Sequence, residues 1–437
     1  MTGKKAATVD ASASRIPGPE PRSFILVAGE ASGDLLGADL IAGLRARFPN
    51  ASFAGIGGQR MRDAGMDIWQ PMERLSVMGL VEVLKHLPAL LALRRYLLQR
   101  TLRERPDVFI GIDAPDFNLG VEKKLKRAGI RSVHYVSPSI WAWRESRAAK
   151  IGNSVDRVLC LFPMEPPIYA RQGVDAHFVG HPLADAFAAH PDKLVARRAL
   201  GLADDARVLA MLPGSRLGEI ARLGRDFLDT VLQLRKEFPH LRVVIPAANA
   251  ACEKAIRELV RDSGPGARDS KEQHTAADES IRILSPESRI PSPGPRLSQS
   301  QLAMIAADAV LLASGTAALE AMLAKRPMVV AYRIAPTTYR IVKALGMLKT
   351  SVYSLPNILA GHTLVPELMQ DDCTPPALAA ALAPMLRARA LPVETRDEFL
   401  RIHESLRGDA WHDAAAAIAD LLDAGPPPST GGGLGGG

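Results

Sequence analysis

Short apolar runs alternate with polar turns and longer amphipathic stretches through the first part of the chain. Such runs are typical of buried β-strands, and the stretches that follow them have apolar residues at helical spacing. The predicted strands are Phe24–Ala28, Ser52–Ile56, Asp107–Ile112, Ser132–Val136, Val158–Phe162 and His177–Val179. This repeated order of strand, turn and helix predicts a parallel, doubly wound α/β sheet.

A second series of the same kind follows the polar, charged passage Ala189–Ala206, which we interpret as a domain boundary. Its predicted strands are Val208–Leu212, Leu241–Pro246, Ile281–Leu284, Ala309–Leu312 and Pro327–Tyr332. The sequence therefore predicts two Rossmann-like domains, at residues 23–188 and 189–374.

The remaining segments differ in composition from these two series. Residues 1–22, 262–300 and 425–437 are rich in Pro, Ser, Gly or charge, which predicts two disordered ends and a flexible insertion in the second domain. Residues 375–424 are rich in alanine and leucine, and we expect them to form helices that pack back on the first domain.

The charge of the chain favours anionic partners. The 437 residues carry a net charge of +7, which suits phosphorylated substrates, an anionic membrane or nucleic acid. Aromatic residues make up only 5% and do not interleave with basic ones, so we expect no nucleic-acid partner. No apolar run reaches the roughly 20 residues that span a bilayer.

Several patterns that would indicate a metal, a cofactor or a nucleophilic serine are missing from the sequence. It contains no GxxxxGK[ST], Asp-x-Asp, HExxH or GxSxG pattern, so we expect neither a P-loop, a metal-clamped diphosphate nor a hydrolase triad. The three cysteines are far apart and are interpreted as reduced core thiols. We therefore predict a protein without a bound metal or cofactor.

Two turns in the second series are suited to phosphate groups. Pro213–Glu219 is a glycine turn that carries Arg216 before a predicted helix, and Ser314-Gly315-Thr316 follows a predicted strand. Free N–H groups at a helix start attract anions, and a guanidinium adds charge. Glu320 lies one helical turn further on, where its carboxylate can accept from ribose hydroxyls. The simpler alternative is a pair of ordinary turns, the second capped by Ser314 or Thr316.

A carboxylate follows the strand Asp107–Ile112, in the motif Gly111–Asn118. Ligands of open α/β sheets bind beyond the carboxyl ends of the strands, so Asp113 is a candidate general base. The alternative is that Asp113 or Asp116 caps a helix that begins near Leu119, and Asp116 fits that cap better. The first turn of the chain carries Glu30, a second candidate at a strand end.

The stretch 78–105 is very apolar, is interrupted by Pro88 and has many basic residues. A basic amphipathic helix of this kind can lie in an anionic membrane interface, but periodicity alone favours the simpler interpretation, a core helix with a solvated basic face. The candidate contact residues are Met78, Leu80, Val81, Leu84, Leu87, Leu90, Leu91, Arg94 and Arg95.

Seven motifs, in this order, resemble those of the lipid-A-disaccharide synthases. They are Val27–Asp34, Ser76–Val83, Gly111–Asn118, His134–Trp143, Leu212–Arg216, Ala313–Glu320 and Leu355–Asn357, and the resemblance extends from about residue 24 to 420. It implies a GT-B glycosyltransferase, in which two Rossmann-like domains face each other across a cleft.

The resemblance also implies a reaction. The donor would be UDP-2,3-diacylglucosamine, the acceptor 2,3-diacylglucosamine 1-phosphate (lipid X), and the products UDP and the β-1′,6-linked disaccharide 1-phosphate of lipid A biosynthesis in Gram-negative bacteria. A β product from an α-linked donor requires one inverting displacement without a metal ion.

The family's site residues map onto this sequence. Asp113 would be the base, with Glu30 as the competing candidate, and Arg216 with the N–H groups of its turn would neutralise the leaving diphosphate. The predicted donor-binding residues are Gly214, Ser215, Arg216, Ser314, Gly315, Thr316, Glu320 and, in the loop Ser354–Leu359, Asn357.

Acylated substrates imply peripheral binding to the cytoplasmic face of the inner membrane, which favours the membrane interpretation of residues 78–105. A homodimer is possible in this family. The competing functions are another UDP-N-acetylglucosamine transferase or epimerase of the same fold, and a non-catalytic basic binding protein.

Overall fold

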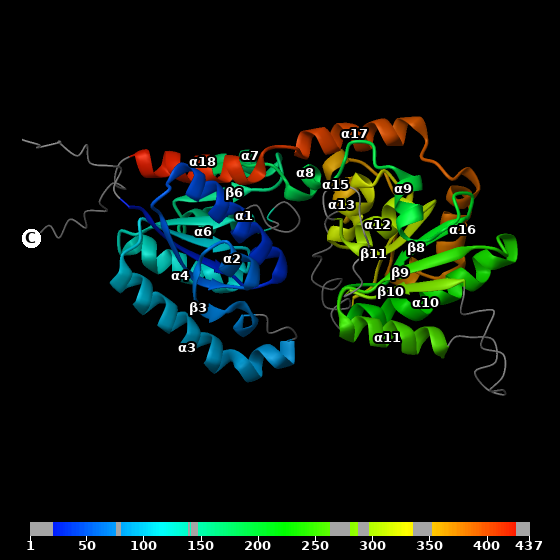
Figure 1. The fold of residues 1–437 in the computed structure, drawn as a ribbon, viewed down its shortest axis with the longest axis horizontal. Coiled ribbons are helices and arrows are strands. Elements are labelled where there is room, and N and C mark those ends of the chain that lie inside the picture. The colour runs from blue at the N-terminus through cyan, green and yellow to red at the C-terminus, as the bar shows by residue number, and fades with distance from the viewer. Residues whose placement is uncertain are drawn as a thin grey trace, which may run out of the picture.

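The computed structural model describes residues 21–75, 80–138, 140, 147–262, 280–286, 297–334 and 352–424. It contains two α/β domains that lie side by side, with the start of the chain in the first of them (Figure 1). The predicted insertion, the predicted disordered ends and Met78 fall wholly or mostly outside the described residues.

The first domain has a seven-stranded sheet in the order β3-β2-β1-β4-β5-β6-β7, and every pair of neighbours is parallel. Its strands are β1 (Ser23–Ala28), β2 (Ser52–Gly57), β3 (Asp67–Pro71), β4 (Val108–Ile112), β5 (Arg131–Tyr135), β6 (Arg157–Cys160) and β7 (Ala176–Phe178). Its helices are α1 (Ala31–Arg47), α2 (Gln59–Asp63), η1 (Met72–Arg74), α3 (Leu80–Glu104), α4 (Pro115–Arg127), α6 (Arg147–Gly152), α7 (Glu165–Ala170) and α8 (Pro182–Ala186).

The second domain has a six-stranded parallel sheet in the order β10-β9-β8-β11-β12-β13. Its strands are β8 (Val208–Leu212), β9 (Arg242–Pro246), β10 (Ile281–Leu284), β11 (Ala309–Ala313), β12 (Met328–Tyr332) and β13 (Glu367–Met369). Its helices are α9 (Lys193–Ala199), α10 (Leu217–Glu237), α11 (Ala250–Arg261), α12 (Gln299–Ala306), α13 (Thr316–Leu323), α15 (Leu355–Ala360) and η2 (Gln370–Asp372). The last described part of the chain forms the helices α16 (Pro375–Ala388), α17 (Val393–Leu406) and α18 (Ala410–Asp423).

The central strands are buried on both faces, which is why they read as continuous apolar runs. All residues of β4 and of β11 are buried, and all eleven predicted strands are present. The sequence did not predict β3 and β13. Both are partly exposed edge strands. Neither contains the continuous apolar run from which the other strands were predicted.

Each sheet has one point at which the strand order reverses. In the first sheet β1 lies between β2 and β4, and in the second β8 lies between β9 and β11. Chain connections leave in opposite directions from such a pair, which opens a crevice at the carboxyl ends of the strands. The turns after β1, β4, β8 and β11 are therefore the positions where each domain can hold a ligand.

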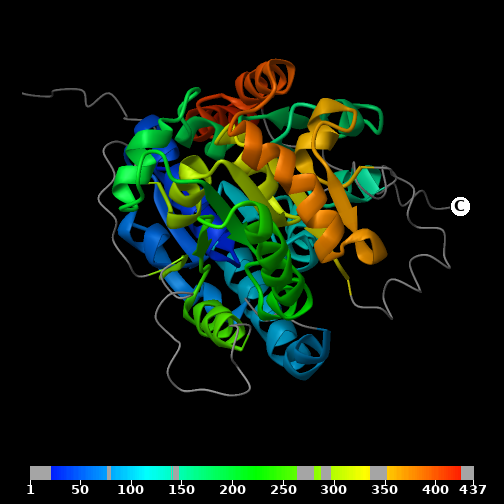
Figure 2. The same cartoon turned by 90° about the vertical axis from the view of Figure 1, so that its right-hand side faces the viewer.

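The C-terminal helices divide between the domains, which differs from the expectation that all of 375–424 packs on the first domain. Apolar residues of α16 and α17 belong to cores of the second domain, whereas those of α18 join the core around β1 and α1. In Figure 1 the orange-red α17 and the red α18 run along the top of both domains, and Figure 2 shows the orange α16 against the second domain. The chain thus crosses between the domains a second time, between α17 and α18.

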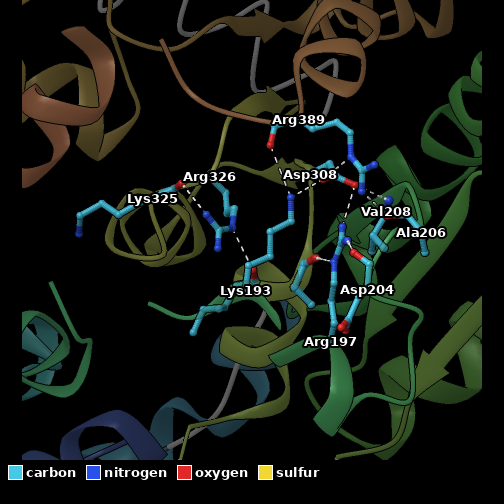
Figure 3. Close-up of polar contacts among 11 residues, drawn as sticks. Lys193, Arg197, Asp204, Ala206, Val208, Asp308, Lys325, Arg326 and Arg389 are labelled. Carbon is cyan, nitrogen blue, oxygen red and sulfur yellow. Dashed lines mark hydrogen bonds and ion pairs between the residues drawn. The ribbon is translucent and has the colours of Figure 1, made fainter. Parts of the chain in front are cut away.

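A buried carboxylate ties the linking helix α9 to the second sheet (Figure 3). Asp308, just before β11, is fully buried and accepts hydrogen bonds from Lys193, from Arg197 at 2.9 Å, from Arg389 at 3.2 Å and from the N–H of Val208 at 2.8 Å. Burial opposes the charge on Asp308, but these donors outweigh it and lower the pKa of Asp308. One side chain therefore joins α9, β8, β11 and the end of α16.

Helix α3 continues through Pro88, so the expected interruption does not occur. Pro88 is the ninth residue of α3 and has no N–H, so the helix lacks the backbone hydrogen bond to the carbonyl of residue 84 at this point. No helix among the described residues is long and apolar enough to cross a membrane.

Candidate active site

The turn after β8 is shaped for an oxyanion. Gly214 has φ +141°, and a Cβ atom on it would lie 2.4 Å from the Cβ of Glu219, so no other residue fits without moving the helix. Arg216 is the N-cap residue of α10. The turn therefore delivers a guanidinium and the first N–H groups of a long helix to the reversal point of the second sheet.

An internal carboxylate occupies this turn. Glu219 Oε2 accepts from the N–H of Ser215 at 2.9 Å and from the N–H of Arg216 at 3.3 Å. Glu219 is the third residue after the N-cap, the capping-box position. Because the N-cap residue is an arginine and not a serine or threonine, the sequence does not show this capping box. The two N–H groups expected to hold a phosphate thus already hold a carboxylate oxygen.

The turn after β11 lies beside the first one, because Leu312 of β11 pairs with Leu212 of β8. Gly315 and Thr316 are exposed, and open space lies above Gly315. Neither Ser314 nor Thr316 caps α13, so the simple capping interpretation has no support. The two turns together form one continuous edge of the site.

The carboxylate of Glu320 is oriented by Gln301, a residue to which the sequence analysis gave no role. Its Oε1 accepts from Gln301 Nε2 at 3.2 Å, and burial raises the pKa of Glu320. The other end of the Gln301 amide accepts from the N–H of Ser298 at 2.8 Å in the capping box of α12. The orientation of Glu320 is therefore fixed by the start of a neighbouring helix.

Asn357 lies in helix α15 and not in the expected loop. It is fully buried, its Nδ2 donates to Val365 O at 2.9 Å and to Glu367 Oε1 at 2.6 Å, and its Oδ1 accepts from the N–H groups of Leu364 and Val365. Because both amide hydrogens are used internally, the structure corrects the expectation of direct donor contact. Asn357 instead fixes the segment that leads into β13.

The turn after β4 contains two consecutive non-glycine residues in the left-handed region, Asp113 at φ +52° and Ala114 at φ +44°. Each costs about 1–2 kcal/mol, and such strain gathers at functional sites. Helix α4 begins at Pro115 with Ala114 as its N-cap and without a side-chain cap. The alternative in which Asp113 or Asp116 caps a helix that begins near Leu119 is therefore wrong, and Asp113 is left at the strand end.

Glu30 lies at the neighbouring strand end. It is exposed and is the N-cap residue of α1, and a Cβ atom on Gly29 beside it would lie 3.4 Å from Ala114 Cβ. Asp34 of the same turn has a structural role, because its carboxylate accepts from three N–H groups at the start of α2, at 2.7 to 3.1 Å. The two candidate bases therefore share the reversal point of the first sheet.

Helix α3 presents apolar side chains to solvent beside this sheet. Leu87 is 43% and Leu91 48% exposed, and Arg95 is also exposed. Arg94 points elsewhere, since it donates to Asp116 O at 2.5 Å and lies over the Phe117 ring. Leu90 is half-buried, and the side chains of Leu80, Val81 and Leu84 lie outside the described residues.

The paired turns suit a nucleoside diphosphate, and comparison with known proteins gives the family. The family model described as lipid-A-disaccharide synthetase matches residues 24–277 and 296–418. The chain belongs to the lipid-A-disaccharide synthase family. It is 53% identical over 420 residues to the lipid-A-disaccharide synthase of Xanthomonas campestris pv. campestris (strain 8004), covering 95% of this chain and 90% of that one. The corresponding protein of Xylella fastidiosa (strain M12) is 55% identical over 397 residues, covering 91% and 97%.

A solved structure extends the comparison to the fold. The UDP-GlcNAc 2-epimerase from Neisseria meningitidis, bound to UDP-GlcNAc, aligns with a TM-score of 0.58 over 92% of this chain and 100% of that one. At 11% identity this likeness shows the shared fold alone. As a lipid-A-disaccharide synthase family member, the chain is a glycosyltransferase with the predicted GT-B fold, and the predicted resemblance is confirmed.

Proposed function

We propose that the chain transfers 2,3-diacylglucosamine from its UDP derivative to the 6-hydroxyl of lipid X, giving the disaccharide 1-phosphate and UDP. The observation that carries the proposal is the family match over both domains, with candidate residues at the reversal point of each sheet. The second domain holds the donor, and the first domain supplies the group that activates the acceptor.

The proposed chemistry is a single inverting displacement. Asp113 takes the proton from the acceptor hydroxyl, and the hydroxyl oxygen forms a bond to the anomeric carbon of the donor sugar. The bond from that carbon to the phosphate oxygen breaks at the same time, and the departing UDP takes the electron pair. Arg216 and the N–H groups of the 214–216 turn stabilise the negative charge that develops on the diphosphate, after Glu219 has moved away. Ser314, Gly315 and Thr316 hold the phosphates, and Glu320 accepts from the ribose. Independence from metal ions remains a prediction.

Glu30 is proposed to bind the acceptor rather than to act as the base. It is exposed at the neighbouring strand end, whereas Asp113 lies on a strained turn that is fixed by its surroundings. A group held in one orientation is better suited to proton transfer.

The reaction is tested by following UDP release from UDP-2,3-diacylglucosamine in detergent micelles with the purified full-length chain. Release that requires lipid X, together with a disaccharide product by mass spectrometry, supports the proposal. Conversion of the sugar nucleotide without acceptor would indicate an epimerase. Binding of both lipids without any turnover would indicate a non-catalytic protein.

We also propose peripheral binding to the cytoplasmic face of the inner membrane through the exposed face of α3. Leu87, Leu91 and Arg95 combine apolar surface with positive charge, as an interfacial helix requires. A single reversal, Arg95→Glu, is expected to weaken binding to anionic liposomes by about 30-fold, since it changes the charge by two units and each charge near the surface contributes about 1 kcal/mol. Flotation measures the bound fraction.

The matched control for this prediction is Arg127→Glu, an exposed residue at the end of α4, which should bind like the parent protein. Arg94 is a poor choice, because its guanidinium braces the segment after Asp113. Equal binding by Arg95→Glu and the parent protein, at low and at physiological salt, would rule out this face.

A further inference from the structure

Beneath the Asp113 turn lies a group of three buried polar side chains that the proposed reaction does not use. Asn118 and Glu122 lie one turn apart on α4 and face the sheet, and His134 lies on β5. All three are fully buried. Buried polar groups are costly unless they are hydrogen-bonded, so a cluster directly below a strained turn requires an explanation.

Asn118 is bonded directly to the turn. Its Nδ2 donates to the carbonyl oxygen of Asp113 at 2.8 Å, and the N–H of Asp113 donates to Tyr135 O at 2.8 Å. The two bonds fix the peptide groups on either side of the Asp113 Cα. They therefore stabilise the left-handed φ of Asp113, which is unfavourable for a residue with a side chain.

Gly111, two residues before Asp113, leaves room for this group. A Cβ atom at position 111 would lie 2.1 Å from Glu122 Oε1 and 2.8 Å from Asn118 Cβ. The Glu122 carboxyl therefore lies directly against the backbone of β4, beside Asn118. Any larger residue at position 111 would displace both side chains, and with them the support of the turn.

The protonation of Glu122 follows from its surroundings. Its Oε1 lies 2.8 Å from His134 Nδ1, and burial raises the pKa of Glu122. Among the described residues, Glu122 Oε2, Asn118 Oδ1 and His134 Nε2 have no hydrogen-bond partner. An ionised pair would bury two charges at a cost of several kcal/mol each. A neutral pair leaves a carboxylic O–H on Glu122, which is a donor, and the oxygen of Asn118, one helical turn away on α4, is an acceptor that lacks a donor.

We propose that Asn118 and an uncharged Glu122–His134 pair are positioning residues for Asp113. Asn118 holds the left-handed turn through the Asp113 carbonyl, and the Glu122 hydroxyl orients the Asn118 amide. The inference rests on the proposed role of Asp113 as the base. None of the three side chains touches the substrate, so their effect is transmitted through the position of the Asp113 carboxylate.

The test compares variants of the full-length chain that differ in hydrogen bonding more than in size. Glu122→Gln reproduces the neutral carboxylic acid and is expected to keep kcat within about threefold of the parent. Glu122→Met and Asn118→Leu remove the hydrogen bonds and are expected to lower kcat by about 10- to 100-fold, the range for a reacting group misplaced by about 1 Å. The KM for the UDP-sugar and the Kd for UDP should stay within about twofold, because the donor is held by the other domain.

Each result supports or overturns part of the inference. A folded Asn118→Leu or Glu122→Met protein with parental kcat overturns the positioning role, and so does a fall in kcat that is matched by weaker UDP binding and a lower Tm. A loss in Glu122→Gln as large as in Glu122→Met overturns the uncharged pair. If Asn118→Leu does not fold, Asn118→Ser, which is too short to reach the Asp113 carbonyl, replaces it.

Asp113→Asn, measured in parallel, separates this inference from the proposed function. Parental turnover by Asp113→Asn would overturn both. An inactive Asp113→Asn protein beside fully active Asn118 and Glu122 variants would overturn only the inference and leave the base assignment in place.

Discussion

Replacing Asp113 by asparagine is expected to lower kcat by about 10²- to 10⁴-fold, the contribution typical of a general base. Asparagine has the same shape and tolerates the left-handed region better than most residues, so the turn and its bonds to Tyr135 and Asn118 can persist. Only the ability to accept a proton is lost. The measurement is UDP release with both substrates saturating, together with the Kd of UDP, which should be unchanged.

Two neighbouring carboxylates provide the matched controls. Asp116→Asn changes an exposed residue on the same segment and should keep the parental kcat. Glu30→Gln should raise the KM for lipid X more than it lowers kcat, as expected for a group that binds the acceptor. The reverse pattern, with Glu30→Gln inactive and Asp113→Asn active, would transfer the role of base to Glu30.

Asp308→Asn is expected to destabilise the second domain by about 3–5 kcal/mol, the cost of leaving a buried charge without its partner. Arg197 is 1% exposed, and two further cations approach the same carboxylate, so the substitution leaves three positive groups facing a neutral amide. Thermal or denaturant unfolding measures the effect. Asp229→Asn, which removes an exposed pair with Arg225, should change stability by less than about 0.5 kcal/mol.

The Asp308 carboxylate also predicts that the free energy of unfolding decreases at acidic pH. The pKa of Asp308 is lowered in the folded protein, so its contribution is complete above the ordinary aspartate value of 3.8 and is lost as the pH falls through the lower folded-state value. The parent protein should therefore lose its advantage over Asp308→Asn as the solution is acidified below about pH 4. A constant difference between the two proteins across that range would contradict the assignment.

The sequence predicted those parts of the fold that depend on local pattern. Buried strands such as β4 and β11 were recognised because every position is apolar, and the turns that follow them were recognised by their glycines and polar residues. The segment Ser354–Leu359 was expected to be a loop, but helix α15 (Leu355–Ala360) begins there with a proline in its first turn, which is a usual helix start. The capping box of α12 also had a visible signal, because Ser298 and Gln301 have the spacing and residue types of that motif.

Other features depend on contacts that no local pattern reveals. Hydrogen bonds from β5 and α4 maintain the left-handed backbone at Asp113 and Ala114. An aspartate followed by an alanine does not by itself predict this backbone conformation. The inward orientation of Asn357 depends on Val365 and Glu367, which follow it by several residues. A motif can thus identify a residue as important without showing whether it touches the ligand or supports a residue that does.

The carboxylate of Glu219 makes anion binding at the 214–216 turn an exchange and not a simple addition. An incoming phosphate has to replace hydrogen bonds that already exist, so part of its interaction with the turn is offset by the loss of those bonds. Because Glu219 belongs to the same chain, its carboxylate competes with every anion for these N–H groups, and only an anion that binds strongly enough can displace it. We therefore expect small free anions to bind this turn more weakly than a nucleotide that is also held at its ribose. The empty turn also keeps its shape, because its N–H groups are never without an acceptor.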